Sequence, residues 1–149
     1  MRIINQFENE YAFLSNFYEK PFIYEGVEYK TAEHAFQAVK CVNKIEANQI
    51  REAATPGQAK RLGRICRLRS DWEDVKVDLM TDIVRAKFQD PELQAMLLAT
   101  DDAILIEGNW WHDNCWGNCS CDRCSSIKGK NNLGKILMQL REDFKHCTP

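Results

Sequence analysis

The sequence predicts a mostly helical α+β fold: a single domain over residues 1–149 with a small β-sheet. Three observations support this prediction. Helix start signals recur along the chain, and apolar residues at helical spacing follow several of them. Short strand-like runs lie near the start and again after residue 102. The length of 149 residues suits one domain with a proper hydrophobic core.

Turn and cap signals in the first half of the chain predict a hairpin and three short helices. The runs 21–24 and 27–29 flank the dipeptide Glu25-Gly26, which favours a hairpin turn. Thr31 predicts the N-cap of a helix over about 32–42.

Two more caps follow in this half. Asn43 with Glu46 is typical of a capping box, and this second helix runs through Ala53. The dipeptide Thr55-Pro56 starts a third helix, which ends near Leu62-Gly63.

The second half begins with the longest predicted helix. Ser70 with Glu73 predicts its capping box, and the helix covers about 71–88. Four of its apolar residues recur at helical spacing and should face the core: Trp72, Val75, Leu79 and Ile83.

The remaining elements alternate in type. Asp90-Pro91 starts the next helix, 103–107 reads as a buried strand, and 133–141 forms the last helix. An irregular stretch from 108 to 130 lies between them and holds three tryptophans, one histidine and four cysteines. That composition favours a packed or liganded loop over a disordered one.

Composition limits the function classes. The net charge of −2 gives the chain no overall electrostatic footprint for nucleic acid. One basic cluster reads as a solvated face: Arg61, Arg64, Arg67 and Arg69. No apolar run approaches a membrane span and no secretory signal opens the chain, so we expect a cytoplasmic protein with no membrane contact and no obligate protein partner.

The segment Gly129-Lys130-Asn131-Asn132-Leu133-Gly134 opens onto the last helix and suggests an anion site. Free backbone N–H groups and the helix dipole would favour a phosphate there. The alternative is an ordinary N-cap at Asn131 or Asn132.

The helix over 32–42 carries a second candidate feature. Glu33, Gln37 and Lys40 form a polar stripe beside the apolar stripe of Ala32, Phe36 and Val39. The polar stripe would line a cleft or form a solvent-facing ridge, and the residues alone favour the ridge.

Taken in order, several motifs resemble the NADAR family, the YbiA-like N-glycosidases. They are Phe13-Leu14-Ser15-Asn16-Phe17, Thr31-Ala32-Glu33-His34-Ala35-Phe36-Gln37-Ala38-Val39-Lys40, Leu62-Gly63, Trp72-Glu73-Asp74-Val75-Lys76, Ala86-Lys87-Phe88, Trp116-Gly117 and the 129–134 segment. The resemblance implies a YbiA-like fold, an N-glycosyl hydrolase activity and an active-site role for Glu33.

An enzyme of this kind breaks the bond between a ribose and a base nitrogen. Glu33 would stabilise the oxocarbenium-like transition state or deprotonate water. Asp113, His112 or a backbone N–H would assist the leaving base. Lys40 would bind ribose or phosphate, or form a Schiff base with the opened sugar.

Substrate binding is expected to combine stacking and hydrogen bonds. Phe17, Trp72 and Trp116 are stacking candidates, with core packing as the alternative. The remaining binding candidates are Asn16, Gln37, Gly117, Gly129 and Asn131.

No cofactor is expected in the chemistry, but a structural zinc is possible. The C-x-x-C pair Cys121 and Cys124 has zinc-knuckle spacing. The ligand set would be either all four cysteines (Cys115, Cys119, Cys121 and Cys124) or three of them together with His112.

The resemblance implies two substrate classes. One is ADP-ribose on guanine in DNA, which would make the protein an ADP-ribosyl glycohydrolase that reverses this modification. The other is a ribosylamino-pyrimidine phosphate from early riboflavin biosynthesis. A non-catalytic module for ADP-ribose or an NAD-derived ligand and a zinc-dependent interaction protein are the alternatives to an enzyme.

Overall fold

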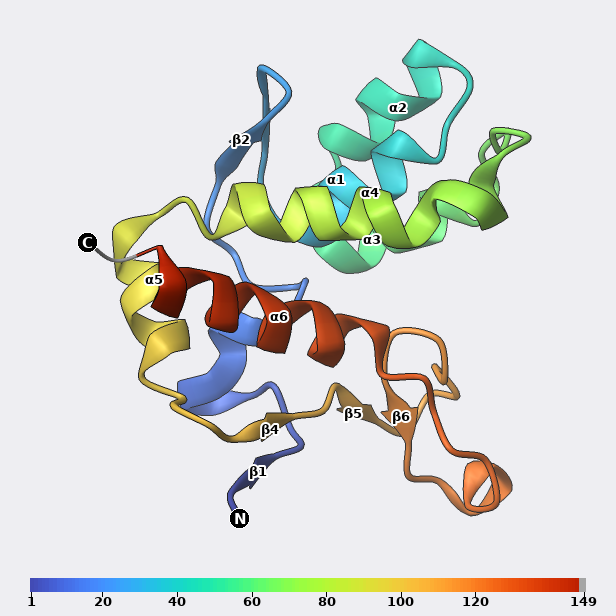
Figure 1. The fold of residues 1–149 in the computed structure, drawn as a ribbon. Coiled ribbons are helices and arrows are strands. Elements are labelled where there is room, and N and C mark those ends of the chain that lie inside the picture. The colour runs from blue at the N-terminus through green and yellow to red at the C-terminus, as the bar shows by residue number, and fades with distance from the viewer. Residues whose placement is uncertain (148–149) are drawn as a thin grey trace. The chain divides into compact units, whose positions relative to one another are not determined.

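The computed structural model describes residues 1–147, which divide into two compact units (Figure 1). Unit 2 is Asn16–Lys87, and unit 1 combines residues 1–15 with the chain from Phe88 onward. The predicted class, mostly helical α+β, is confirmed. The strands form three two-stranded pairs instead of one small sheet. The single domain remains a prediction. Within residues 1–147, no helix combines the length and the apolar character that a membrane span requires.

Unit 2 begins with the predicted hairpin. Strands β2 (Phe22–Tyr24) and β3 (Val27–Tyr29) pair antiparallel. Both turn residues, Glu25 and Gly26, have left-handed backbones, with φ of 50° and 78°. Two successive positive φ values define the tight turn that matches the twist of a hairpin.

Three short helices follow, each with the N-cap expected from the sequence. They are α1 (Ala32–Val39), α2 (Lys44–Arg51) and α3 (Pro56–Gly63). The side chains of Thr31, Asn43 and Thr55 accept backbone N–H groups of the first turns.

Two details of these helices differ from the sequence prediction. Helix α1 stops before residue 42, because the chain beyond it pairs with residues 67–69 through hydrogen bonds from Val42 to Arg67 and from Arg69 to Lys40. The second difference concerns Glu46, the predicted partner of Asn43 in a capping box: its carboxylate accepts the Arg67 N–H at 3.2 Å.

Helix α4 (Trp72–Lys87) packs against α1 and β2. Of the four residues predicted to face the core, Trp72 and Ile83 are buried, whereas Val75 and Leu79 are only half-buried. The buried face continues through three further residues: Met80, Val84 and Lys87.

Unit 1 contains two parallel strand pairs and the C-terminal helix. Strand β1 (Ile3–Ile4) pairs with β4 (Ile104–Leu105), and β5 (Gly108–Asn109) pairs with β6 (Asn118–Cys119). The helical elements are η1 (Asn9–Leu14), α5 (Pro91–Leu98), η2 (Asp122–Cys124) and α6 (Asn132–His146).

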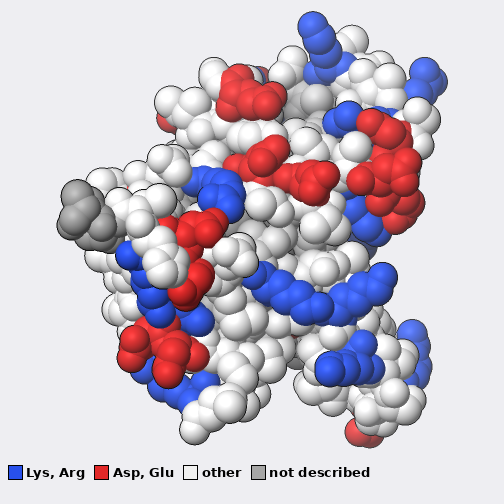
Figure 2. Space-filling view, in the orientation of Figure 1, with Lys and Arg blue, Asp and Glu red and all other residues white. Residues whose placement is uncertain are grey.

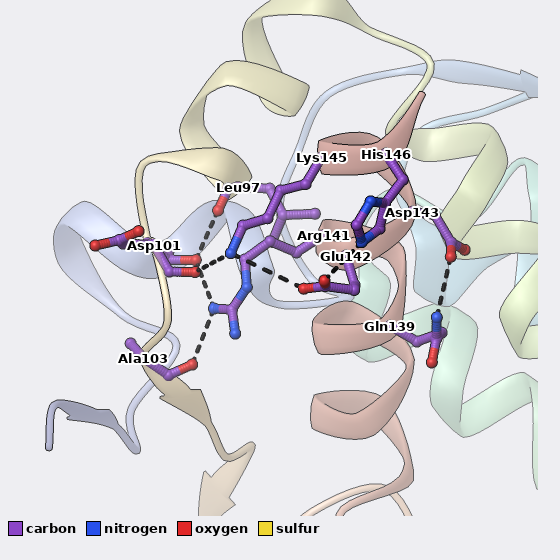
Figure 3. Close-up of polar contacts among 10 residues, drawn as sticks. Leu97, Asp101, Ala103, Gln139, Arg141, Glu142, Asp143, Lys145 and His146 are labelled. Carbon is purple, nitrogen blue, oxygen red and sulfur yellow. Dashed lines mark hydrogen bonds and ion pairs between the residues drawn. The ribbon is translucent and has the colours of Figure 1, made fainter. Parts of the chain in front are cut away.

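Helix α6 is longer than expected, and a buried arginine anchors its second half. Leu133, Leu137 and Leu140 form its apolar face. Arg141 is 6% exposed, and its Nη1 donates to Thr100 Oγ1 and to the carbonyl of Ala103, both at 2.9 Å. Figure 3 shows this guanidinium reaching from α6 toward the loop before β4. These two hydrogen bonds from a charged donor offset part of the cost of its burial, while the buried Nε has no hydrogen-bond partner among the described residues.

Helices α1 and α3 pack closely where Gly63 faces Gln37. A Cβ at residue 63 would overlap the Gln37 carboxamide. Gly57, at the other end of α3, has its nearest neighbouring atoms at 3.9 Å, which is ordinary contact.

We expect Gly63→Ala to destabilise the protein by roughly 1–3 kcal/mol, because the overlap forces a buried side chain to move. Gly57→Ala is the matched control, and it should be neutral or stabilising by up to ~1 kcal/mol. Chemical denaturation of both variants measures the difference. Equal stabilities would contradict the close packing of α1 on α3.

Candidate functional site

Glu33 and Gln37 of the polar stripe are buried and Lys40 is half-buried, so the stripe does not form a solvent-facing ridge. Glu33 is 7% exposed and Gln37 is 4% exposed. The Gln37 Nε2 donates to Glu33 Oε2 at 2.5 Å. A short bond to a carboxylate is strong and fixes the orientation of both groups. Glu33, the glutamate singled out from the sequence, is therefore a desolvated carboxylate whose orientation is fixed by a hydrogen bond.

Asn16 lies directly against this turn of α1. Its carbonyl accepts the Glu33 backbone N–H at 3.0 Å, and its Nδ2 contacts the Met80 sulfur at 3.5 Å. Two buried oxygens, Asn16 Oδ1 and Gln37 Oε1, have no hydrogen-bond partner within the described part of the chain. Buried acceptors without a partner are rare in native proteins and suggest a place for a donor from a ligand.

Two aromatic–lysine contacts lie in unit 2. The Phe17 ring is 43% exposed, with Lys60 Nζ 6.0 Å from its centroid. Lys40 Nζ lies 5.9 Å from the Phe36 ring centroid and 5.8 Å from that of Trp72. Phe17 is therefore a partly exposed aromatic ring with a cation over it.

Trp72 is buried in contact with Phe36, which favours packing over stacking on a substrate for this residue. The two ring centroids are 5.1 Å apart, and Trp72 is 7% exposed. Burial lowers the pKa of Lys40, and the nearby carboxylate of Glu33 opposes this shift.

Lys87 is a candidate that sequence reasoning did not single out. It is 3% exposed, its Nζ lies 5.8 Å from the Tyr18 ring centroid, and burial lowers its pKa to about 7. The available signal was its position on the same helical face as Met80, Ile83 and Val84, where a lysine is unusual.

In unit 1, the Asp113 carboxylate accepts main-chain hydrogen bonds within the loop between β5 and β6. Its Oδ1 accepts the backbone N–H groups of Cys115 at 3.1 Å and Trp116 at 2.8 Å. The Asn109 side chain donates to the Asp113 carbonyl and accepts its N–H. These contacts are typical of an Asx turn and give Asp113 a structural role. Its role as an acid stays a prediction.

The backbone N–H groups that the expected anion site at the start of α6 would use are already bonded within the protein. The N–H groups of residues 130–133 donate to the carbonyls of residues 114–117, at 2.8–3.2 Å. Asn131 occupies the N-cap position in a left-handed conformation with φ of 52°, and its side chain makes no cap bond. Instead its Nδ2 donates to the Leu105 carbonyl at 2.9 Å, and its Oδ1 accepts the Glu107 N–H at 3.0 Å.

The other loop candidates also serve packing. A Cβ on Gly117 would overlap the Glu107 carboxylate and carbonyl, and one on Gly129 would overlap the Gly117 carbonyl. These glycines allow two main-chain segments to approach closely. Trp116 is half-buried.

The four-cysteine zinc set needs a correction. The Cys115 sulfur lies apart and accepts from Asn132 Nδ2 at 3.7 Å. His112 takes its place, because its ring nitrogen gathers with the sulfurs of Cys119, Cys121 and Cys124.

Comparison with known proteins defines the class as the YbiA-like fold. The N-glycosidase YbiA of Escherichia coli is 41% identical over 139 residues, which cover 91% of this chain and 83% of that protein. The NMR structure of Escherichia coli YbiA matches with a TM-score of 0.83 and 38% identity, over 98% of this chain and 88% of that one.

The NADAR domain family matches residues 4–145, and the chain belongs to the NADAR family. The resemblance inferred from the motifs is confirmed. A protein of Vibrio vulnificus named for riboflavin biosynthesis is 34% identical over 145 residues, which cover 95% of this chain but 38% of that protein.

The depressed pKa of Lys87 predicts a pH dependence of stability. An unfolded lysine titrates near 10.4, so above pH ~7 the unfolded chain binds more protons than the native one. The free energy of unfolding should therefore rise between pH ~7 and ~8.5, with a contribution from Lys87 of up to ~1.4 kcal/mol per pH unit. At higher pH, Cys41 acts in the opposite sense, because its pKa is raised to about 12.

Denaturation of wild type and Lys87→Met across this window measures the effect. Lys40 is present in both proteins, so the difference in slope isolates Lys87. The Lys87→Met slope should be smaller, and equal slopes would show that Lys87 is charged in the native state.

Proposed function

We propose that this protein hydrolyses the N-glycosidic bond between a phosphorylated ribose and a base nitrogen, and that its substrate is ADP-ribose attached to guanine in DNA. The coarser part, an N-glycosyl hydrolase, agrees with the activity named for YbiA, to which the chain is similar over nearly its full length. The finer part rests on the arrangement of unit 2.

The buried Glu33–Gln37 pair is the observation that carries the proposal. Breaking an N-glycosidic bond creates positive charge on the sugar, and a desolvated carboxylate of fixed orientation stabilises such charge better than an exposed one. The same carboxylate can take a proton from the attacking water. The unpartnered oxygen of Asn16, beside this turn of α1, suits a donor such as a ribose hydroxyl.

The exposed Phe17–Lys60 contact favours ADP-ribose over a smaller metabolite. Phe17 follows Asn16, whose carbonyl is bonded to the Glu33 N–H, so the aromatic ring is anchored next to the catalytic turn. ADP-ribose carries an adenine that can stack on an exposed aromatic ring and a pyrophosphate that attracts a lysine. A ribosylamino-pyrimidine phosphate has neither a second base nor a second phosphate.

The surface charge agrees with a limited contact to DNA. Figure 2 shows acidic and basic side chains mixed over the face it presents, and the net charge is −2. A protein of this kind cannot grip a long duplex through many phosphates. It can take up one modified nucleotide extruded from the strand.

Riboflavin-pathway chemistry is the second candidate, because a similar protein of Vibrio vulnificus is named for it. This chain corresponds to 38% of that protein, so the name describes a longer polypeptide.

Turnover by wild type and Glu33→Gln tests both candidates. Each protein is offered a guanine-ADP-ribosylated oligonucleotide and, separately, a ribosylamino-pyrimidine phosphate, with products resolved by mass. We expect wild type to release ADP-ribose from the oligonucleotide and Glu33→Gln to be slower by about 10²–10⁴-fold in kcat. Glu28→Gln, on the exposed edge of β3, is the control and should match wild type.

Each remaining outcome assigns a different function. Cleavage of the pyrimidine compound alone would make the protein a metabolite N-glycosidase. Binding of ADP-ribose without cleavage of either compound would make it a binding module. Borohydride trapping of a covalent adduct, lost in Lys40→Arg or Lys87→Arg, would assign a Schiff-base step to that lysine.

A further inference from the structure

Four potential metal ligands gather in the loop of unit 1, outside the site described above. His112 follows β5, Cys119 ends β6, Cys121 precedes η2 and Cys124 ends it. Their ligand atoms all lie within 4.8 Å of one another. The three cysteines are close in sequence, but His112 is seven residues before the first of them and is brought to the sulfurs by the fold of the loop.

The distances fit a tetrahedral centre. The Nδ1 atom of His112 lies 3.3 Å from the Cys121 sulfur, 3.4 Å from the Cys124 sulfur and 3.9 Å from the Cys119 sulfur. Around a zinc ion with bonds of ~2.3 Å to sulfur and ~2.0 Å to nitrogen, neighbouring ligand atoms are about 3.5–3.8 Å apart. One ring nitrogen therefore faces all three sulfurs at the spacing that a shared ion requires.

The surroundings also suit thiolates. The backbone N–H of His112 donates to the Cys119 sulfur at 3.3 Å. Hydrogen bonds of this kind orient metal-bound sulfurs and stabilise their charge. Cys119 and Cys124 are buried, and His112 has a strained left-handed backbone with φ of 72° that aims its ring at them.

We propose that His112, Cys119, Cys121 and Cys124 bind one structural Zn²⁺ ion. Three sulfurs and one imidazole are a typical ligand set for structural zinc. All four positions come from the protein, so no position is open for water, and the ion holds the loop without taking part in hydrolysis. Its place in the fold explains why a long irregular segment is ordered: residues 118–129 lie between the hydrogen-bonded segments 114–117 and 130–133, and the ion would tie the three cysteines of this loop to His112, which precedes both segments.

Metal analysis of purified wild type tests the proposal. The protein is purified without chelators, and zinc is counted by mass spectrometry. We expect about one zinc per chain, and a large loss of zinc in Cys121→Ser and Cys124→Ser. Cys115→Ser is the matched control, because Cys115 lies in the same loop but outside the cluster, and it should keep its zinc.

A second measurement applies if the cysteine variants fold poorly. Wild type stripped of metal is titrated with Co²⁺, whose visible absorption reports tetrahedral coordination by thiolates. The spectrum should saturate at about one Co²⁺ per chain, and His112→Ala should shift it. A disulfide within the cluster, a wild type that takes up neither ion, or zinc loss in Cys115→Ser equal to that in Cys121→Ser would overturn the proposal.

Discussion

The burial of α1 is the constraint on which unit 2 depends. Every residue of Ala32–Ala38 is buried, including the polar Glu33, His34 and Gln37. A buried polar group without a partner costs roughly 1–3 kcal/mol, so the neighbouring elements must supply partners. Glu33 and Gln37 bond each other within α1, with Gln37 Oε1 left without a partner among the described residues, whereas His34 bonds outside the helix.

His34 connects the start of α1 to the end of α2. Its Nε2 lies 3.0 Å from the carbonyl of Ala53, which only accepts hydrogen bonds, so this nitrogen carries the proton. The Nδ1 therefore accepts the hydroxyl of Thr31 at 2.8 Å. Burial lowers the pKa of His34, which keeps the ring neutral and this bonding pattern intact near pH 7. One helix therefore serves both the fold and the candidate site: Thr31 and His34 fix the start of α1, and Glu33, the proposed catalytic residue, lies between them.

Local signals were sufficient to predict the caps and the hairpin. Thr31, Asn43 and Thr55 act within three residues of themselves, and Glu25-Gly26 forms its turn without distant help. The sequence also placed Glu33 and Gln37 one helical turn apart, and the structure shows that they touch. Whether this stripe faced water depended on packing by other elements, and only the family resemblance favoured burial.

Long-range contacts explain the errors. The polar segment before α6 looks the same in sequence whether its N–H groups are free or bonded, and the carbonyls that bind them lie more than ten residues earlier. Lys87 was missed because its burial depends on tertiary packing, and His112 was one of several possible ligands until the fold brought it to the three sulfurs.

The pairing of residues 130–133 with 114–117 has an evolutionary consequence. All four bonds join main-chain atoms, so the bonds themselves require no particular side chain. Gly117, Asn114 and Asn131 are constrained separately, by close packing or by side-chain hydrogen bonds. An inserted or deleted residue within either segment would instead shift the register and break several of these bonds. Relatives should therefore keep the length of both segments, with length changes confined to the intervening residues and side-chain changes concentrated at positions other than 114, 117 and 131.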